Sequence, residues 1–115
     1  TVFFVVDKTG NSGKSWFCAH CEKRFDNCQV MKCGKRDDMA FELFEDPKIV
    51  MIDVSRSSTE FLNYQFLEDV KDGRVFSPKY ESYTKRFDPP HVVVMMNEEP
   101  NELKLSSDRY KIIFT

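Results

Sequence analysis

The residues with the clearest chemical meaning stand at positions 10–15, where the chain reads Gly-Asn-Ser-Gly-Lys-Ser. They follow an apolar run at positions 2–6 and precede a segment with helical character. Strand, glycine-rich turn and helix in this order are typical of a phosphate-binding loop, whose backbone N–H groups meet phosphate oxygens at the helix N-terminus. In such a loop Lys14 reaches the β- and γ-phosphates, and the Ser15 hydroxyl is suited to Mg²⁺. The pattern predicts a nucleoside triphosphate bound by Gly10, Asn11, Ser12, Gly13, Lys14 and Ser15.

One position departs from the full pattern of such a loop. The pattern asks for a glycine five residues before Gly13, and this chain has Lys8 there. Two interpretations stay open. Either Asp7 and Lys8 accommodate a differently built turn, with Gly10 providing the close backbone approach, or the loop is degenerate.

Length and composition favour a single domain over residues 1–115. A chain of 115 residues with 41% hydrophobic content buries one core and leaves no room for a second. It contains no 18-residue apolar run and no signal-peptide pattern, so we expect a soluble intracellular domain with no membrane partner. Because a core strand begins almost at the first residue, we also expect this domain to be a piece of a longer protein.

The charge pattern argues against one broad basic surface. The net charge is −2, and the basic residues fall in pairs and short groups at 23–24, 35–36, 71–74 and 85–86. Such groups are compatible with a few loops that contact nucleic-acid phosphates and equally with ordinary solvated faces. We favour solvated faces for most of them.

Four cysteines and His20 raise the question of a zinc site. Cys18 and Cys21 fall on the helix predicted after the glycine-rich turn. Cys28 and Cys33 bound a predicted strand, and because side chains alternate along a strand, these two should point in opposite directions. We therefore expect reduced, partly buried thiols rather than a tetrahedral zinc site.

The remaining sequence alternates between strand and helix patterns. Apolar runs predict strands at 2–6, 28–33, 48–53, 91–96 and 110–114, and helical patterns predict helices at 14–24, 39–44 and about 60–71, with a hairpin or extended segment at 74–83. In the first helix we expect Trp16, Phe17 and Cys21 to face inward. The alternation predicts a three-layer α/β fold with a mostly parallel central sheet.

Two polar residues end predicted strands and complete a candidate site. Ligands of parallel sheets bind beyond the carboxyl ends of the strands, where the turn at 10–15, Asp53 and Asn97 should all lie. Asp53 would hold Mg²⁺ or its water opposite Ser15, and Asn97 would orient the attacking water or sense the γ-phosphate. The alternatives are a turn or capping carboxylate for Asp53 and a turn residue before Pro100 for Asn97.

Several blocks together resemble the superfamily 3 helicase domain of replication-initiator (Rep) proteins of circular single-stranded DNA viruses and their satellites. The blocks are Gly-Asn-Ser-Gly-Lys-Ser, Ile-Val-Met-Ile-Asp-Val-Ser-Arg, Asn-Tyr with Leu-Glu-Asp-Val-Lys-Asp-Gly, Lys-Tyr-Glu-Ser, Val-Val-Val-Met-Met-Asn-Glu-Glu-Pro and Leu-Ser-Ser-Asp-Arg-Tyr. The resemblance implies an AAA+-like P-loop NTPase fold and an ATP- and Mg²⁺-dependent 3′-to-5′ DNA helicase. In the full-length protein it implies a ring, expected to be a hexamer, that acts in rolling-circle replication in the host nucleus.

The same resemblance implies roles for individual residues. It assigns the loop lysine and serine to Lys14 and Ser15, the metal-binding aspartate to Asp53 and the sensor asparagine to Asn97. Arg109 would be an arginine finger supplied to the ATP of a neighbouring subunit, and a surface ion pair is the alternative. The segment between Asp53 and Asn97 would contact single-stranded DNA through Lys71, Arg74, Lys79 and Tyr80.

Two departures limit what the resemblance implies. Many superfamily 3 members carry a second acid, the expected general base, after the metal-binding aspartate, and Val54 stands there in this chain. Water activation would then come from Asp53 itself or from another residue, or hydrolysis would be slow. The endonuclease and assembly segments of the family lie outside the resemblance, so we expect nicking, joining and stable oligomerisation to need more than this chain. Two other functions stay open: an RNA helicase of the picornavirus-like branch, and a degenerate nucleotide-binding or protein-interaction module without turnover, which Lys8 and Val54 favour.

Overall fold

The computed structural model describes residues 1–8, 13–101 and 108–115. Its elements in chain order are β1 (Val2–Val6), α1 (Lys14–Arg24), β2 (Cys28–Lys32), α2 (Arg36–Glu42), β3 (Ile49–Asp53), the 3₁₀ helix η1 (Arg56–Phe61), α3 (Tyr64–Asp72), β4 (Arg74–Ser77), β5 (Tyr83–Arg86), β6 (His91–Met96) and β7 (Tyr110–Phe114). The predicted bounds of α1 and of the five long apolar strands are confirmed to within one residue.

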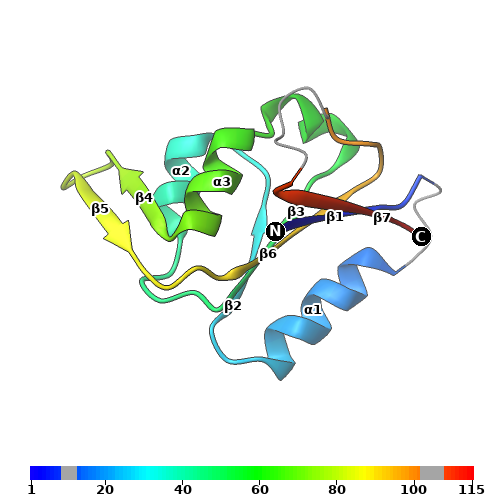
Figure 1. Cartoon of the computed structure of the whole chain (residues 1–115), viewed down its shortest axis with the longest axis horizontal. Coiled ribbons are helices and arrows are strands. Elements are labelled where there is room, and N and C mark those ends of the chain that lie inside the picture. The colour runs from blue at the N-terminus through cyan, green and yellow to red at the C-terminus, as the bar shows by residue number, and fades with distance from the viewer. Residues whose placement is uncertain (9–12, 102–107) are drawn as a thin grey trace.

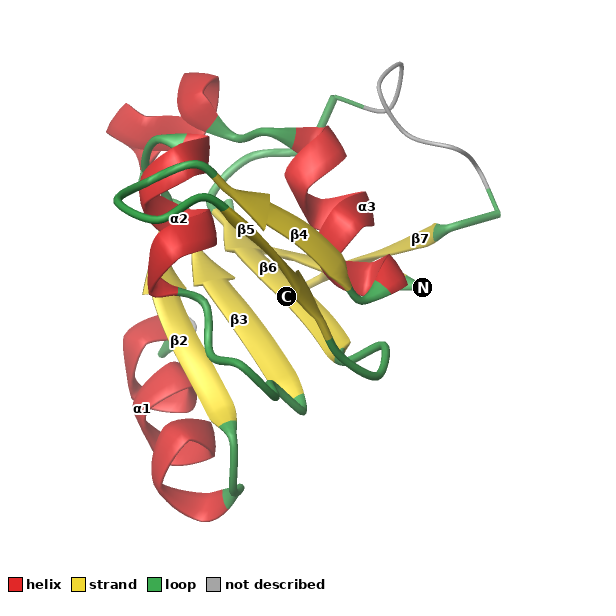
Figure 2. Ribbon diagram, turned by 90° about the vertical axis from the view of Figure 1, so that its left-hand side faces the viewer, coloured by secondary structure: helices red, strands yellow, loops and turns green. Residues whose placement is uncertain are grey.

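Five strands form one central sheet in the order β2-β3-β6-β1-β7, and every neighbouring pair is parallel. Figure 2 shows β2, β3 and β6 side by side and pointing the same way. The prediction of an α/β fold with a mostly parallel sheet is therefore confirmed. Because the strands are parallel and in register, their carboxyl ends meet at one edge, which is the edge where ligands bind in such sheets.

Helices cover both faces of this sheet and make three layers (Figure 1). Alternate strand residues pack on opposite sides, which explains why the strands read as continuous apolar runs. On one face Phe4 and Ile52 pack in the same core as Phe66 of α3. On the other face Met51 and Met95 pack with cysteines of α1. The two cores hold the strand ends, and hence the site, in fixed positions.

The prediction that Trp16 and Phe17 face the core is wrong. Their side chains are 69% and 43% exposed, whereas Cys18 and Cys21 are buried, as expected for Cys21. Each helical residue turns by about 100°, so a buried face centred on positions 18 and 21 leaves position 16 on the far side. The Trp16 ring instead stacks on His20, with ring centroids 5.1 Å apart.

The two shorter helices differ from their predicted ranges chiefly in where their first turns begin. α2 begins at Arg36, since Asp37 and Asp38 in its first turn suit the positive end of the helix dipole. α3 begins only at Tyr64, because the Asn63 side chain caps it by accepting a hydrogen bond from the third residue on. The predicted start of that helix forms the separate η1 turn.

Gly73 joins α3 to the β4–β5 hairpin, which confirms the predicted hairpin and extends it to Arg86. Its φ of 81° is favourable only for glycine, and a Cβ at this position would collide with the backbone oxygen of Phe87. None of the helices in the described ranges has the length and apolar character to span a membrane.

Candidate functional site

The structure brings the predicted strand-end residues together at the carboxyl edge of the sheet. Lys14 opens α1 after β1, Asp53 is the last residue of β3, and Asn97 directly follows β6. Strand β6 lies between β1 and β3, so the three positions are adjacent. A cavity of about 460 Å³ opens here, and the described residues that line it are Asp7, Gly13, Lys14, Ser15, Trp16, Arg56 and Asn97.

Lys14 and Asp53 form an ion pair at this edge. The Lys14 Nζ lies 3.0 Å from Asp53 Oδ1 and 3.4 Å from the carbonyl oxygen of Val54. The two side chains are 14% and 22% exposed, so the pair is partly shielded from solvent. A phosphate near Lys14 and a metal ion near Asp53 would each draw one partner out of this pair.

Gly13 shapes the start of α1. It is the N-cap residue with φ 76° and ψ 31°, in the left-handed region that glycine adopts without strain. Its conformation leaves the first N–H groups of an 11-residue helix at the cavity, where they suit an anion. The predicted contacts of Gly10, Asn11 and Ser12 fall outside the described residues.

Three of the described lining residues were not predicted for this site. Trp16 was expected to face inward, and Asp7 and Arg56 each have a sequence signal that points to them. Asp7 is only 2% exposed, and it follows β1 directly, a strand-end position like that of Asn97. Arg56 stands three residues after Asp53, and its Nη2 donates a hydrogen bond to the backbone oxygen of Lys8 at 3.1 Å. Both residues follow the carboxyl ends of parallel strands, where the ligands of such sheets bind.

A second cavity of about 410 Å³ adjoins the first and shares Gly13, Lys14 and Trp16 with it. Its other described lining residues are Val5, Phe17, Met95 and Thr115. The two cavities differ in character, because polar side chains surround the first and mostly apolar ones surround the second. The outward position of Trp16 and Phe17, which corrects the prediction, is what places their rings at this apolar wall.

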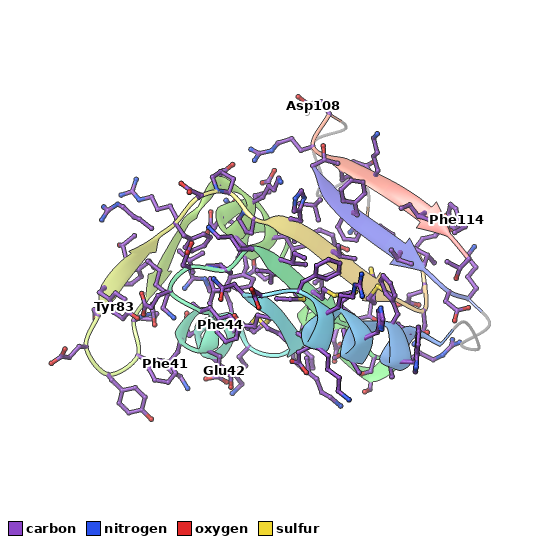
Figure 3. The ribbon with its side chains drawn as sticks, turned by 90° about the horizontal axis from the view of Figure 1, so that it is seen from below. Phe41, Glu42, Phe44, Tyr83, Asp108 and Phe114 are labelled. Carbon is purple, nitrogen blue, oxygen red and sulfur yellow. The ribbon has the colours of Figure 1, made fainter. Side chains whose placement is uncertain are left out.

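Arg109 does not join the other predicted catalytic residues within one chain. It precedes β7, and its carbonyl accepts a hydrogen bond from the Val2 amide at 2.8 Å, which places it at the amino edge of the sheet. Figure 3 shows its neighbour Asp108 and Phe114 at opposite ends of β7. The guanidinium pairs with Asp72 and with Glu68, and the hydrogen bond to Asp72 raises the pKa of Arg109 above its usual value.

The residues predicted to contact DNA lie at both ends of the hairpin. Lys71 donates to the Pro90 carbonyl at 2.9 Å, and Arg74 begins β4 on the exposed side. Lys79 pairs with Asp38, which raises the pKa of Lys79 and lowers that of the carboxyl group. The connection between β4 and β5 also carries aromatic residues, with Tyr80 being 87% exposed and its ring centroid 5.0 Å from that of Phe41. Figure 3 shows Phe41 near Tyr83 at this end.

The cysteines divide between the two faces of the sheet. Cys18, Cys21 and Cys28 share one core with Met51, whereas Cys33 packs against the other. The prediction that Cys28 and Cys33 point in opposite directions is therefore confirmed. Burial raises the pKa of Cys18 to about 11 and also raises the pKa values of Cys28 and Cys33. No group of three metal-ligating side chains of the His, Cys, Asp or Glu type occurs within the described ranges.

Comparison with known proteins places this chain beside viral replication proteins. It is 37% identical over 115 residues to Para-Rep C9 of Faba bean necrotic yellows C9 alphasatellite, covering 98% of this chain and 41% of that protein. It is 42% identical over 83 residues to Para-Rep C1 of Milk vetch dwarf C1 alphasatellite, covering 70% of this chain and 30% of that protein. It is 33% identical over 112 residues to the master replication protein of Banana bunchy top virus, covering 97% of this chain and 38% of that protein.

The chain thus spans about two fifths of the length of the curated relatives that it matches along nearly all of its own length. No protein-family model matches it, and no solved structure does so at a significant level. The site residues Lys14, Asp53 and Asn97 all fall inside the matched region, since it includes 98% of the chain. The homologues of this chain are replication-associated proteins of viruses and alphasatellites, and the chain is similar to one part of them.

Proposed function

We propose that this chain is the P-loop ATPase domain of a viral Rep-type replication protein and that it uses ATP and Mg²⁺ to drive DNA unwinding. The observation that carries the proposal is the meeting of Lys14, Asp53 and Asn97 at one edge of the sheet beside the polar cavity. Similarity to proteins named for replication supports the biological setting. The parallel sheet, with its helices on both faces, is compatible with a P-loop NTPase.

The donor groups at this edge fit a magnesium nucleotide. Mg²⁺ prefers oxygen ligands, and the Ser15 hydroxyl and the Asp53 carboxylate would supply two of them. Lys14 would turn from Asp53 to the β- and γ-phosphates, and the helix N-terminus at Gly13 would add positive potential. Asn97 would orient water beside the γ-phosphate. The nucleobase would lie in the adjoining apolar cavity, which Trp16 helps to line.

Water activation is the step that this chain arranges differently. Val54 stands where many superfamily 3 helicases, which this chain resembles, carry an acid, and its side chain is fully buried in the core. Asp7 lines the cavity, and Asp53 pairs with the cavity residue Lys14. One of these two carboxylates would therefore activate the water. We expect slow turnover for the chain alone, because a well-placed general base raises the rate by roughly 10²- to 10⁴-fold.

The remaining parts of the proposal concern the full-length protein. Single-stranded DNA would contact the hairpin through Lys71, Arg74, Lys79 and Tyr80. Subunits would associate into a ring, by resemblance a hexamer, in the host nucleus. Arg109 lies at the opposite edge from Lys14, so it would act only on the nucleotide of a neighbouring subunit.

Phosphate release from Mg²⁺-ATP, measured with and without single-stranded DNA, tests this function. Lys14→Ala should abolish hydrolysis while the melting temperature stays nearly unchanged, because Lys14 lies at the N-terminus of α1 rather than in the core. Lys23→Ala, which removes an exposed lysine from the last turn of the same helix, is the matched control. Equal turnover in the parent and Lys14→Ala would contradict a phosphate-loop role.

A nucleotide-binding module without turnover is the second candidate, and the buried Val54 is the observation that favours it. Such a module would bind Mg²⁺-ATP with the same dependence on Lys14 but release no phosphate under any condition of assembly. Stimulation by single-stranded RNA instead of single-stranded DNA would favour the RNA helicase alternative.

A further inference from the structure

Arg56 is the second basic side chain on the described wall of the polar cavity. It begins η1 and lines this cavity together with Lys14 and Asn97. Nothing in the packing of the core requires it, because Arg56 is exposed and η1 contains no buried residue. A long cationic side chain with these neighbours is placed to contact an anion in the cavity.

The side chain of Arg56 crosses the carboxyl edge of the sheet. Arg56 follows β3, whereas the Lys8 carbonyl that accepts its hydrogen bond at 3.1 Å follows β1. Strand β6 lies between β1 and β3, and Asn97 stands at the end of β6. The Arg56 side chain therefore reaches across the end of β6, beside which the terminal phosphate is expected. It also links the segment after Asp53 to the residues that follow β1.

The negative charges around the cavity favour a second cation beside a bound nucleotide. Asp53 already opposes the Lys14 ammonium group at 3.0 Å, and Asp7 places a further carboxylate on the cavity wall. A nucleoside triphosphate brings several more negative charges, of which Mg²⁺ and Lys14 offset only a part. Lys14 and Arg56 are the basic residues that line the described part of this cavity. A cation at Arg56 lowers the repulsion where an added phosphate would lie.

We propose that Arg56 binds the γ-phosphate of ATP within the same subunit and so makes the site prefer ATP to ADP. The inference rests on the proposed function. A guanidinium carries N–H donors in a planar fork, so one edge can keep its hydrogen bond to the Lys8 carbonyl while another edge donates to phosphate oxygens. Arg56 and Arg109 then differ in role, since Arg109 lies at the amino edge and would reach only a neighbouring subunit's nucleotide.

The test compares the affinities for ADP and for a non-hydrolysable ATP analogue, both with Mg²⁺. Trp16 is the only tryptophan of the chain and lines the cavity, so its fluorescence reports binding directly. Arg56→Ala should weaken binding of the ATP analogue by about 10- to 100-fold and that of ADP by less than about threefold, because a hydrogen bond to a charged group is lost only with the longer nucleotide. Arg56→Lys should retain part of the preference, since it keeps the charge but loses the fork.

Arg24→Ala is the matched control, because Arg24 ends α1 about 15 Å along the helix from Lys14. Both Arg56 variants should melt near the parent temperature, as expected for an exposed side chain. Equal weakening of both nucleotides would mean that Arg56 only fixes the loop through Lys8, and it would overturn the assignment. Unchanged affinities for both would overturn it as well. A parent chain that responds to neither nucleotide would instead overturn the proposed function, and this assignment with it.

Discussion

The Lys14 ammonium group lies 3.0 Å from the Asp53 carboxylate, although the strands that precede these residues are separated by β6. The pair joins the group expected to hold phosphate to the group expected to hold metal. Each ligand must therefore compete with the partner that is already in place. Phosphate draws Lys14 away from Asp53, and Mg²⁺ draws Asp53 away from Lys14, so binding of the two ligands should be coupled.

Asp53→Asn tests this coupling. With Mg²⁺ present the variant should bind ATP about tenfold or more weakly, because a carboxylate ligand of the metal is lost. With Mg²⁺ chelated the variant should bind ATP as well as the parent or better, because Lys14 no longer has to break an ion pair with a carboxylate before it contacts phosphate. Calorimetry under both conditions measures the two affinities. An identical loss with and without Mg²⁺ would make Asp53 a purely structural residue.

The buried thiol of Cys18 should make stability fall at high pH. Its pKa is raised from 9.0 to about 11, mainly by burial and then by the charge of Asp53. The folded state therefore keeps its proton where the unfolded chain has lost it, so this contribution is complete below pH 9 and disappears as the pH rises toward about 11. Cys18→Ala should lower stability at all pH values through its cavity, but with a shallower decline over this window. Urea denaturation at several pH values gives the free energy of unfolding of the parent and of Cys18→Ala as a function of pH. Parallel pH dependences for the two proteins would contradict the expectation.

The purified chain should carry no stoichiometric zinc. Cys33 lies on the opposite face of the sheet from Cys18, Cys21 and Cys28, so four thiols cannot form one tetrahedron. A chelator should leave the melting temperature unchanged, whereas a structural zinc site would lose folding free energy with its metal. Elemental analysis provides the direct measurement, and one zinc per chain would refute this expectation.

Arg109 should act between subunits. The chain alone should be a weak ATPase whose specific activity rises with protein concentration or with an added assembly domain, because arginine fingers contribute roughly 10³- to 10⁵-fold in rate in GTPases. In the single chain Arg109→Ala removes an exposed ion pair with Asp72, which should cost less than about 1 kcal/mol of stability.

Mixing two inactive variants separates this role from a role within one chain. Arg109→Ala and Lys14→Ala, each without activity alone, should together recover part of it, because only mixed interfaces pair an intact loop with an intact finger. Phosphate release from the mixture is the measurement. If it stays inactive under conditions where the parent assembles and turns over, Arg109 does not act on a neighbouring subunit.

Local patterns explain which elements were predicted well. The strands are buried on both faces, so each reads as a continuous apolar run whose ends are visible in the sequence. The turn at 10–15 predicts the start of α1 at Lys14 correctly. The placement of Asp53 and Asn97 follows from the same patterns, since each stands where an apolar run ends. The start of α3 was displaced because one capping residue, Asn63, decides where that helix begins. The start of α2 has no side-chain cap, and its first turn includes Asp37 and Asp38, which lie before the predicted range.

Short-range apolar patterning in the sequence is enough to place Asp53 and Asn97 at the ends of strands and Lys14 at the start of the first helix. The strand order β2-β3-β6-β1-β7, which sets which strand ends are neighbours, is known only from the folded molecule. That order places Arg56 across the end of β6 and leaves Arg109 at the opposite edge. Pairing between strands far apart in the chain depends on long-range contacts, which no local periodicity records.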